Sequence, residues 1–220
     1  VTLNSVSNDG NKPVITANNQ NYTFDAVLYA TGRKPNTANI GLENTDITTN
    51  ERGAIVVNDT CESSVPGVYA VGDVNGGPQF TYISLDDFRI VFGALTGNGQ
   101  YTLKDRKNIP YTTFLTPPLA RVGLTEEDAI NKGYTVKTKE MLVATMPRAH
   151  VNDYLKGAFK IVVNADNDLI LGATLYSQGA EELINLIKMA MDNNIPYTYF
   201  KNQIFTHPTM AENLNDLCNF

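Results

Sequence analysis

The pattern of hydrophobic and polar residues predicts an irregular first half of the chain and a regular second half. In residues 1–30, the stretch "PVITANNQNYTFDAVLYATG" contains a short strand, a turn rich in Asn, a second strand, and the apolar run Ala26–Ala30. Asn tolerates the positive φ that such a turn needs. Residues 33–54 are predicted to be mostly loop, because proline and glycine punctuate them.

Two further strands and one helix are predicted between residues 54 and 97. The apolar runs "AIVVN" at 54–58 and Val68–Val71 have the composition of buried strands. The stretch "TYISLDDFRIVFGALTG" predicts a helix, with Gly97 as its stop signal. Its expected apolar face consists of Ile83, Phe88, Val91 and Leu95.

The second half begins after a polar, charged stretch near residues 101–110, which is a candidate domain boundary. "LARVGLT" (119–125) predicts a strand, and "TEEDAINKG" predicts a short helix capped by Thr125 and Asp128. "YTVKTKEMLVATM" predicts a strand. "GAFKIVVNADNDLILGATLYS" predicts a hairpin with an Asn- and Asp-rich turn.

Three helices are predicted after this hairpin. "SQGAEELINLIKMAMDNN" has one broad apolar face, formed by Leu183, Ile184, Ile187, Ala190 and Met191. "PYTYFKNQ" predicts a short helical turn, and "THPTMAENLNDL" predicts the start of the last helix. The chain is therefore predicted to be α+β, with a partial α/β segment followed by an antiparallel sheet that carries helices on one side.

Composition narrows the class of protein. The chain has 220 residues and is 42% hydrophobic, which is enough for a packed core. Its net charge of −6 and lack of a basic run argue against binding to nucleic acid or to an anionic membrane. It has no signal-peptide pattern and no apolar run of the roughly 20 residues that a membrane helix needs.

The cysteines and the first residue add two expectations. Cys61 and Cys218 lie far apart and form no metal-ligand or C-x-x-C cluster, so a disulfide framework is excluded. This fits a reducing, cytoplasmic location, and no metal site is expected. The chain begins with Val in mid-pattern, so we expect it to belong to a longer protein.

Two motifs in the first half carry candidate binding chemistry. In "YATGRKPN" (29–36), the apolar run 26–30 is expected to be a strand that ends at Gly32, where backbone can approach a ligand closely. "VYAVGD" delivers Asp73 at the carboxyl end of an apolar run, the usual ligand side of an α/β sheet. A carboxylate there can accept hydrogen bonds from ligand hydroxyls. Taken singly, a strand-to-loop transition and a helix N-cap explain these motifs equally well.

The third motif, "IFTHPTMAENL" (204–214), contains His207 and Glu212. An imidazole titrates near neutral pH, so it can hold or donate a proton. A carboxylate bonded to its other nitrogen fixes the tautomer and stabilises the imidazolium. The competing interpretation is a histidine that caps a helix or packs at an interface. The other histidine, His150, is expected in a polar loop on the surface, without a role.

Together and in this order, the three motifs resemble the C-terminal part of the pyridine nucleotide-disulfide oxidoreductases. Glutathione reductase, dihydrolipoamide dehydrogenase and mercuric reductase share that plan. The resemblance implies three parts. Residues 1–30 are the tail of an NAD(P)-binding domain, residues 31–104 the C-terminal part of an FAD-binding domain, and residues 105–220 a dimerisation domain.

The resemblance also implies roles for individual residues. His207 is the general acid/base and Glu212 orients it, and the pair acts on the redox thiols of the partner subunit in a homodimer. The residues expected to contact FAD are Thr31, Gly32, Arg33, Gly72, Asp73, Gln79, Phe80 and Thr81.

Longer stretches narrow the resemblance to one branch of the family. "GDVNGGPQFTYISLDDFRIV" and "RKNIPYTTFLTPPLARVGLTEEDA" are similar to a bacterial branch tied to defence against reactive chlorine species and hypothiocyanous acid, near the mercuric reductases. Mercuric reductases often end in a cysteine pair. Cys218 stands alone, so mercury chemistry is not expected.

Two motifs that the chemistry needs do not occur in the sequence. There is no G-x-G-x-x-G after a strand and no C-x-x-x-x-C redox pair. We therefore expect FAD and NAD(P)H to bind the longer parent, and this chain to retain neither.

Three alternatives compete with the leading interpretation. The isolated chain could act as a dimerisation module without catalysis, or the parent could have dihydrolipoamide, glutathione or mercuric reductase activity. An NAD(P)H oxidase or peroxidase of the same fold is disfavoured, because those relatives need no C-terminal His–Glu pair.

Overall fold

The computed structural model describes all residues, 1–220, and divides into two compact units, Val1–Leu103 and Lys104–Phe220. The first unit begins with an antiparallel sheet of three strands, β1 (Leu3–Asp9), β2 (Lys12–Ala17) and β3 (Gln20–Thr23). The β2–β3 turn is formed by Asn18 and Asn19, with φ values of 48° and 63°. The predicted Asn-rich turn is thus confirmed.

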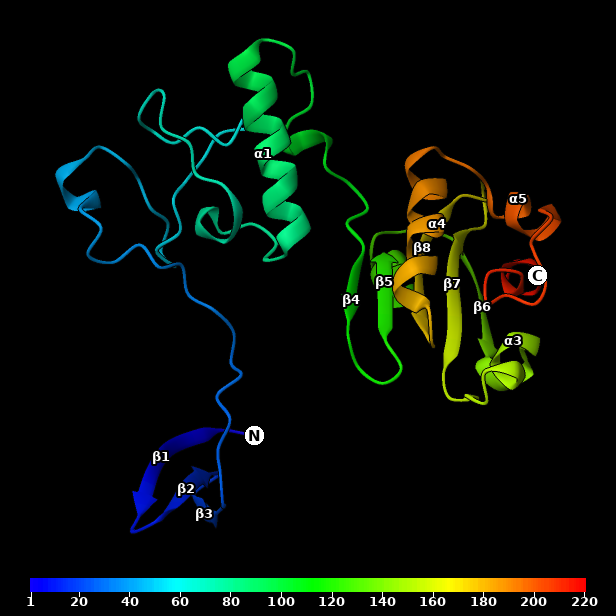
Figure 1. The fold of residues 1–220 in the computed structure, drawn as a ribbon, viewed down its shortest axis with the longest axis horizontal. Coiled ribbons are helices and arrows are strands. Elements are labelled where there is room, and N and C mark those ends of the chain that lie inside the picture. The colour runs from blue at the N-terminus through cyan, green and yellow to red at the C-terminus, as the bar shows by residue number, and fades with distance from the viewer. The chain divides into compact units, whose positions relative to one another are not determined.

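The first unit contains one long helix, α1 (Thr81–Thr96), which ends at Gly97 with φ 71° (Figure 1). Its predicted position is confirmed, but its predicted apolar face is partly wrong. Ile83 and Ile90 are buried, whereas Phe88 and Leu95 are 54% and 65% exposed. The reason is that α1 packs on a short 3₁₀ turn, η2 (Gly72–Asn75), which covers only a narrow strip of the helix.

The apolar runs at 26–30, 54–58 and Val68–Val71 are not strands, so these predictions were wrong. The latter two contribute only isolated bridges, Thr49 to Ile55 and Glu62 to Tyr69. An apolar composition suits a buried strand, but a strand exists only where a neighbour completes its hydrogen-bond ladder. The first unit provides no such neighbour along these runs. A second 3₁₀ turn, η1 (Leu42–Asn44), lies in the long loop.

The second unit is built on a five-stranded antiparallel sheet. Its order is β4-β5-β8-β7-β6. The strands are β4 (Tyr111–Thr113), β5 (Leu119–Gly123), β6 (Val136–Leu142), β7 (Ala158–Asn164) and β8 (Ile170–Tyr176). The predicted hairpin is β7–β8, and its turn includes Asp168 at φ 61°.

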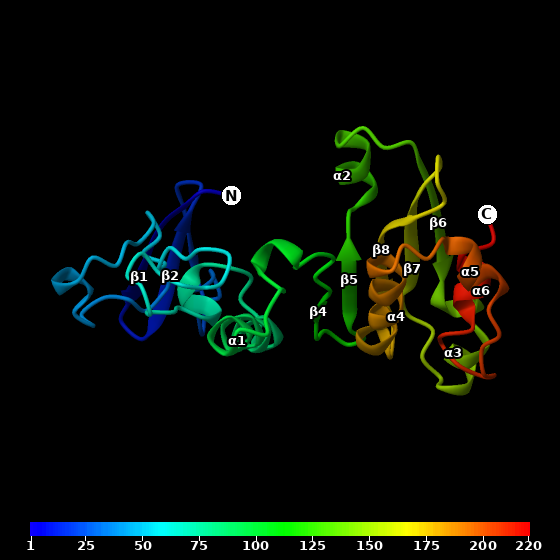
Figure 2. The same ribbon diagram turned by 90° about the horizontal axis from the view of Figure 1, so that it is seen from above.

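Five helices accompany this sheet. They are α2 (Glu126–Asn131), α3 (Pro147–Val151), α4 (Ala180–Asp192), α5 (Tyr197–Asn202) and α6 (Asn213–Leu217). Helix α4 packs on β5 and β8, and α6 packs on β6 and β7 (Figures 1 and 2). The prediction of an antiparallel sheet with helices is confirmed, and the chain is α+β. The prediction that the helices all lie on one side is wrong, because Glu126 of α2 pairs with Lys160 on the other face of the sheet.

The core of the second unit lies between the sheet and helices α3 to α6. Across neighbouring strands, Ala120, Leu175 and Phe159 are aligned in register and fully buried. They belong to the same buried cluster as the predicted apolar face of α4 and as Leu214 and Leu217 of α6. Burying a large aliphatic or aromatic side chain contributes about 1.5–3 kcal/mol, so this cluster fixes α6 to the sheet.

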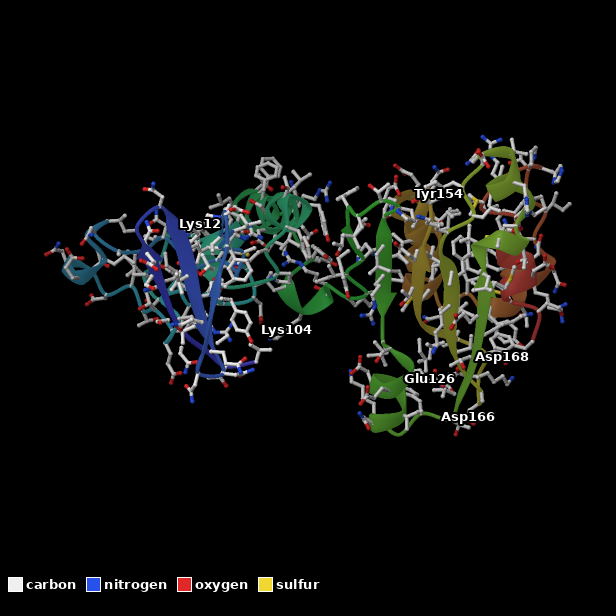
Figure 3. All side chains as sticks on the ribbon, turned by 90° about the horizontal axis from the view of Figure 1, so that it is seen from below. Lys12, Lys104, Glu126, Tyr154, Asp166 and Asp168 are labelled. Carbon is white, nitrogen blue, oxygen red and sulfur yellow. The ribbon has the colours of Figure 1, made fainter.

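The opposite side of the sheet carries charged residues. Arg121, Thr174 and Lys160 are aligned across three strands. Lys160 pairs with Glu126 at 2.6 Å, at the start of α2, where Figure 3 labels the carboxylate. The predicted capping box of α2 is confirmed, because the Asp128 N–H donates to Thr125 Oγ1 and the Thr125 N–H donates to the Asp128 carboxylate.

Strands β1 and β4 and helix α3 were not predicted from the sequence. His150 lies in α3 rather than in a loop. The last helix begins at Asn213 and not near Thr206. Pro208 and the hydrogen bonds of Thr209 to its own neighbours keep the preceding residues out of the helix. No helix has the length and apolarity that crossing a membrane requires.

Candidate functional site

The segment between α5 and α6 carries His207 and has no regular secondary structure. Side-chain amides hold it in place. Asn215 Nδ2 donates to the carbonyls of Phe200 (2.7 Å) and Gln203 (2.9 Å), which joins α6 to the end of α5. The buried Asn213 Nδ2 donates to the Thr209 carbonyl at 3.2 Å. The loop is therefore defined by specific contacts rather than by a helix.

His207 and Glu212 form a close pair in this loop. His207 Nδ1 lies 2.7 Å from Glu212 Oε2, and the Thr209 N–H donates to Glu212 Oε1 at 2.9 Å. The imidazole is 68% exposed, whereas the carboxylate is 19% exposed. The structure thus brings together the two residues that were predicted from the sequence to act as a pair. Each Glu212 carboxylate oxygen has a defined hydrogen-bond partner.

The electrostatics of the pair determine where the protons lie. The hydrogen bond from His207 lowers the pKa of Glu212, and the Thr209 backbone hydrogen bond lowers it further. An ionised carboxylate only accepts hydrogen bonds, so Nδ1 must carry the hydrogen between the two residues. This leaves Nε2 of an exposed ring available to exchange a proton with a bound partner.

A second group of predicted residues meets in the first unit. Arg33 Nη1 lies 2.9 Å from Asp73 Oδ2, and Arg33 Nη2 donates to the Gln79 carbonyl at 2.7 Å. The Asp73 side chain is 45% exposed. Arg33 therefore joins two loop segments and leaves the Asp73 carboxylate accessible.

The loop that carries Asp73 is anchored by a residue that the sequence did not single out. Asp87 is fully buried on α1, and its Oδ2 accepts from the Gly72 N–H at 2.7 Å and from Asn75 Nδ2 at 2.9 Å. Gly72 has φ 72°, and a Cβ there would lie 2.8 Å from Ser84 Oγ. A glycine is thus required at position 72. An acidic residue at 87, between Ile83 and Ile90 on the helix, is the sequence signal that was available.

The remaining predicted residues lie near the same elements. Thr31 and Gly32 are exposed, and Gly32 has φ 106°. Phe80 is the N-cap of α1, and its ring stacks on Tyr82 with centroids 5.1 Å apart. Thr81 is the first residue of α1, whose initial N–H groups lack intrahelical acceptors.

These features fit one wall of a flavin site. An accessible carboxylate suits the hydroxyls of a ribityl chain, and the N-terminus of the 16-residue α1 suits an electron-rich ring atom. No set of three or more His, Cys, Asp or Glu side chains is arranged to hold a metal ion.

Both cysteines are buried. Cys218 is fully inaccessible in the core beside α6, and burial raises its pKa to about 12. A thiol must be deprotonated to attack or to bind a soft metal. Cys218 therefore has the environment of a packing residue.

Comparison with protein families identifies the class. Residues 109–218 match the model of the pyridine nucleotide-disulphide oxidoreductase dimerisation domain, and residues 1–87 match the pyridine nucleotide-disulphide oxidoreductase model. The chain belongs to the pyridine nucleotide-disulphide oxidoreductase family. The resemblance found in the sequence is thereby confirmed.

Individual relatives are similar over nearly the whole chain. The probable pyridine nucleotide-disulfide oxidoreductase RclA of Escherichia coli is 45% identical over 212 residues, which are 96% of this chain and 48% of that protein. A mercuric reductase of Staphylococcus aureus is 35% identical over 218 residues, 97% of this chain and 40% of that protein.

A solved structure shows the same fold. The HOCl-induced flavoprotein disulfide reductase RclA from Escherichia coli matches with a TM-score of 0.94 and 44% identity, over 99% of this chain and 50% of that one. The chain thus spans about half the length of the relatives it matches, or less.

Proposed function

We propose that this chain forms the C-terminal part of an NAD(P)H-dependent flavoprotein disulfide oxidoreductase. In this proposal residues 105–220 form the homodimer interface and present His207 to the redox thiols of the partner subunit. Residues 1–30 and 31–104 are the C-terminal parts of the NAD(P)- and FAD-binding domains. The family matches over residues 1–87 and 109–218 support the division near residue 104, and the unit boundary after Leu103 agrees with it.

The observation that carries the proposal is the 2.7 Å contact between His207 Nδ1 and Glu212 Oε2, on an imidazole that is 68% exposed. Thiol–disulfide exchange runs through a thiolate, and the departing thiolate needs a proton. A neutral imidazole with Nδ1–H on a carboxylate takes up a proton at Nε2, and the carboxylate stabilises the resulting cation. His207 can thus receive a thiol proton and return it to a leaving thiolate.

The first unit supplies part of the cofactor site in this proposal. Bound FAD would carry electrons from NAD(P)H to the thiols. Asp73 would accept hydrogen bonds from ribityl hydroxyls, and Arg33 holds the Asp73 carboxylate in place from 2.9 Å. Gln79, Phe80 and Thr81 would contribute the start of α1 to the same wall.

The substrate in this proposal is a reactive chlorine species or hypothiocyanous acid. The E. coli relative RclA is an HOCl-induced flavoprotein disulfide reductase, and it is more similar to this chain than the S. aureus mercuric reductase is. The burial of Cys218 supports the choice, because an inaccessible thiol cannot pass a mercuric ion to the active site.

The proposal is tested by replacing His207 in the flavin-loaded, full-length enzyme that contains this chain. His207→Gln is expected to lower disulfide- and oxidant-linked turnover by roughly a hundredfold or more, which is the usual contribution of a general acid/base. Reduction of the flavin by NAD(P)H is expected to continue at an unchanged rate, because that step precedes the thiols.

The chain provides its own control, since His150 is the only other histidine. His150 is exposed, and its Nε2 lies 2.8 Å from the Ala144 carbonyl. His150→Gln is expected to leave turnover intact. Equal turnover in the His207→Gln enzyme and the wild type would reject the acid/base role and favour a chain that serves only as a dimerisation module.

A further inference from the structure

Glu212 takes part in a second hydrogen-bonded motif in addition to its contact with His207. The Thr209 N–H donates to Glu212 Oε1 at 2.9 Å, and the Glu212 N–H donates to Thr209 Oγ1 at 3.2 Å. This reciprocal pattern across T-x-x-E is a capping box, here formed one turn before α6. Its two ends are the proposed orienting carboxylate and a threonine two residues after His207.

The two oxygens of the carboxylate are divided between the two motifs. Oε1 accepts from the Thr209 backbone, and Oε2 lies against His207 Nδ1 at 2.7 Å. The box therefore fixes the rotation of the carboxylate plane. An oxygen that would otherwise turn freely is held toward the imidazole.

The Thr209 hydroxyl also connects both ends of the loop. It donates to the Thr206 carbonyl at 2.7 Å while it accepts from the Glu212 N–H. One hydroxyl thus spans the backbone from the residue before His207 to Glu212. Residues 203–209 form no helix or strand, and beyond Gln203 the backbone–backbone hydrogen bonds of the loop begin only at the Met210 carbonyl, so the Thr209 hydroxyl ties the part that carries His207 to Glu212.

We propose that Thr209 is a positioning residue for the His207–Glu212 pair, and that its hydroxyl holds Glu212 where it selects the Nδ1–H tautomer of His207. Thr209 touches no reacting atom in this proposal. Its catalytic consequence rests on the proposed function, whereas its effect on the tautomer is a property of this chain alone. The motif T-x-x-E occurs in "HPTMAE", but no capping box was predicted there from the sequence.

The tautomer is measured on the 220-residue chain by ¹⁵N NMR of the His207 ring above its titration range. Thr209→Val keeps the shape of the side chain and removes the hydroxyl. It is expected to lower the ratio of Nδ1–H to Nε2–H forms, by at most the roughly three- to tenfold that one net hydrogen bond is worth, because the lost bond acts on the tautomer through the position of Glu212. Thr209→Ser retains the hydroxyl and is expected to restore the wild-type ratio.

Thr145 provides a matched control. Its Oγ1 donates to the carbonyl three residues earlier, Leu142, at 2.7 Å, as Thr209 does to Thr206. Thr145→Val removes an equivalent hydroxyl in the same unit, and the His207 tautomer is expected to stay unchanged. An unchanged ratio in Thr209→Val, with the chain folded by circular dichroism, overturns the inference.

Turnover of the full-length enzyme separates this inference from the proposed function. If Thr209→Val shifts the tautomer and lowers thiol-linked turnover while flavin reduction is unchanged, both stand. If it shifts the tautomer but His207→Gln leaves turnover intact, the positioning stands and the acid/base role fails. If His207→Gln lowers turnover but Thr209→Val changes neither the tautomer nor turnover, the inference fails alone.

Discussion

At the scale of single residues, Glu212 combines two tasks. One carboxylate oxygen closes a local folding motif with Thr209, and the other faces His207. Its side chain is 19% exposed, while the imidazole that it orients is 68% exposed. In the proposed mechanism, this arrangement keeps the orienting carboxylate fixed in the loop and leaves the ring that exchanges protons open to a partner.

The lowered pKa of Glu212 makes the loop sensitive to acid. A carboxylate whose pKa is depressed by folding stabilises the fold above its unfolded pKa, and this stabilisation is lost as the pH falls through the folded pKa. In ¹³C NMR titrations of the side-chain carboxyl, His207→Gln is expected to raise the Glu212 pKa toward its ordinary value. Equal midpoints in wild type and His207→Gln would contradict this assignment of cause, and His150→Gln should leave the midpoint in place.

Cys218 is expected to be unreactive in the folded chain. Burial raises its pKa to about 12, so the thiolate is scarce at neutral pH and the sulfur is inaccessible as well. Mass spectrometry after alkylation in mildly alkaline buffer should find Cys218 labelled only when denaturant is added. Rapid labelling of the native chain would contradict this and would reopen a thiol relay to the active site.

At the level of helices and strands, the features that could be predicted from the sequence are those that depend on the local pattern of hydrophobic and polar residues. The predictions of the apolar face of α4 and of the capping box of α2 were correct. Helix periodicity and helix caps depend only on residues that are neighbours in the sequence. The prediction of strands at 54–58 and Val68–Val71 was wrong, because a strand depends on hydrogen-bonding partners that the hydrophobic pattern does not specify.

The residues of the candidate site also divide into those that local motifs predict and those whose role depends on contacts in the folded chain. His207, Glu212, Arg33 and Asp73 were selected from motifs, and the structure brings each of these pairs together. Asp87 and Thr209 were not selected. Their importance lies in contacts with backbone N–H groups, and one of these contacts crosses from a helix to a distant loop.

The loop that carries Asp73 should depend on Asp87. Asp87→Ala removes the acceptor of the Gly72 N–H and of Asn75 Nδ2, and a buried donor without a partner costs about 1–3 kcal/mol. Hydrogen exchange of the Gly72 amide is expected to accelerate by roughly tenfold or more. Asp25→Ala, which removes only a 93% exposed carboxylate, should leave that exchange unchanged. Unaltered protection in Asp87→Ala would show that another contact holds the loop.

At the scale of the whole molecule, the chain consists of a regular sheet-and-helix unit and a less regular first unit. The second unit has one continuous core and matches a dimerisation domain over residues 109–218. The first unit has a three-stranded sheet and one helix with exposed aromatic residues. This contrast agrees with a chain whose first part contributes to a cofactor site and whose second part supports an interface.

The 220-residue chain is expected to form a colourless dimer. Size-exclusion chromatography with light scattering should give twice the 24.1 kDa mass of the chain, because residues 109–218 match the dimerisation domain. No flavin absorbance is expected, since the chain contains no glycine-rich phosphate loop. A monomer would show that the interface needs further residues, and flavin absorbance would contradict the expectation that this loop is required.

In the proposed enzyme, His207 of one subunit serves the redox thiols of the other. Mixing the wild-type 220-residue chain with a full-length enzyme that carries His207→Gln places His207 and the thiols on different chains. The short chain has His207 but no C-x-x-x-x-C pair, so it cannot perform this chemistry alone. The full-length His207→Gln enzyme is expected to retain roughly a hundredth of wild-type turnover or less. We expect mixed dimers to regain thiol-linked turnover, and a short chain with His207→Gln to restore none. Mixed dimers that form by light scattering but remain inactive would contradict the claim.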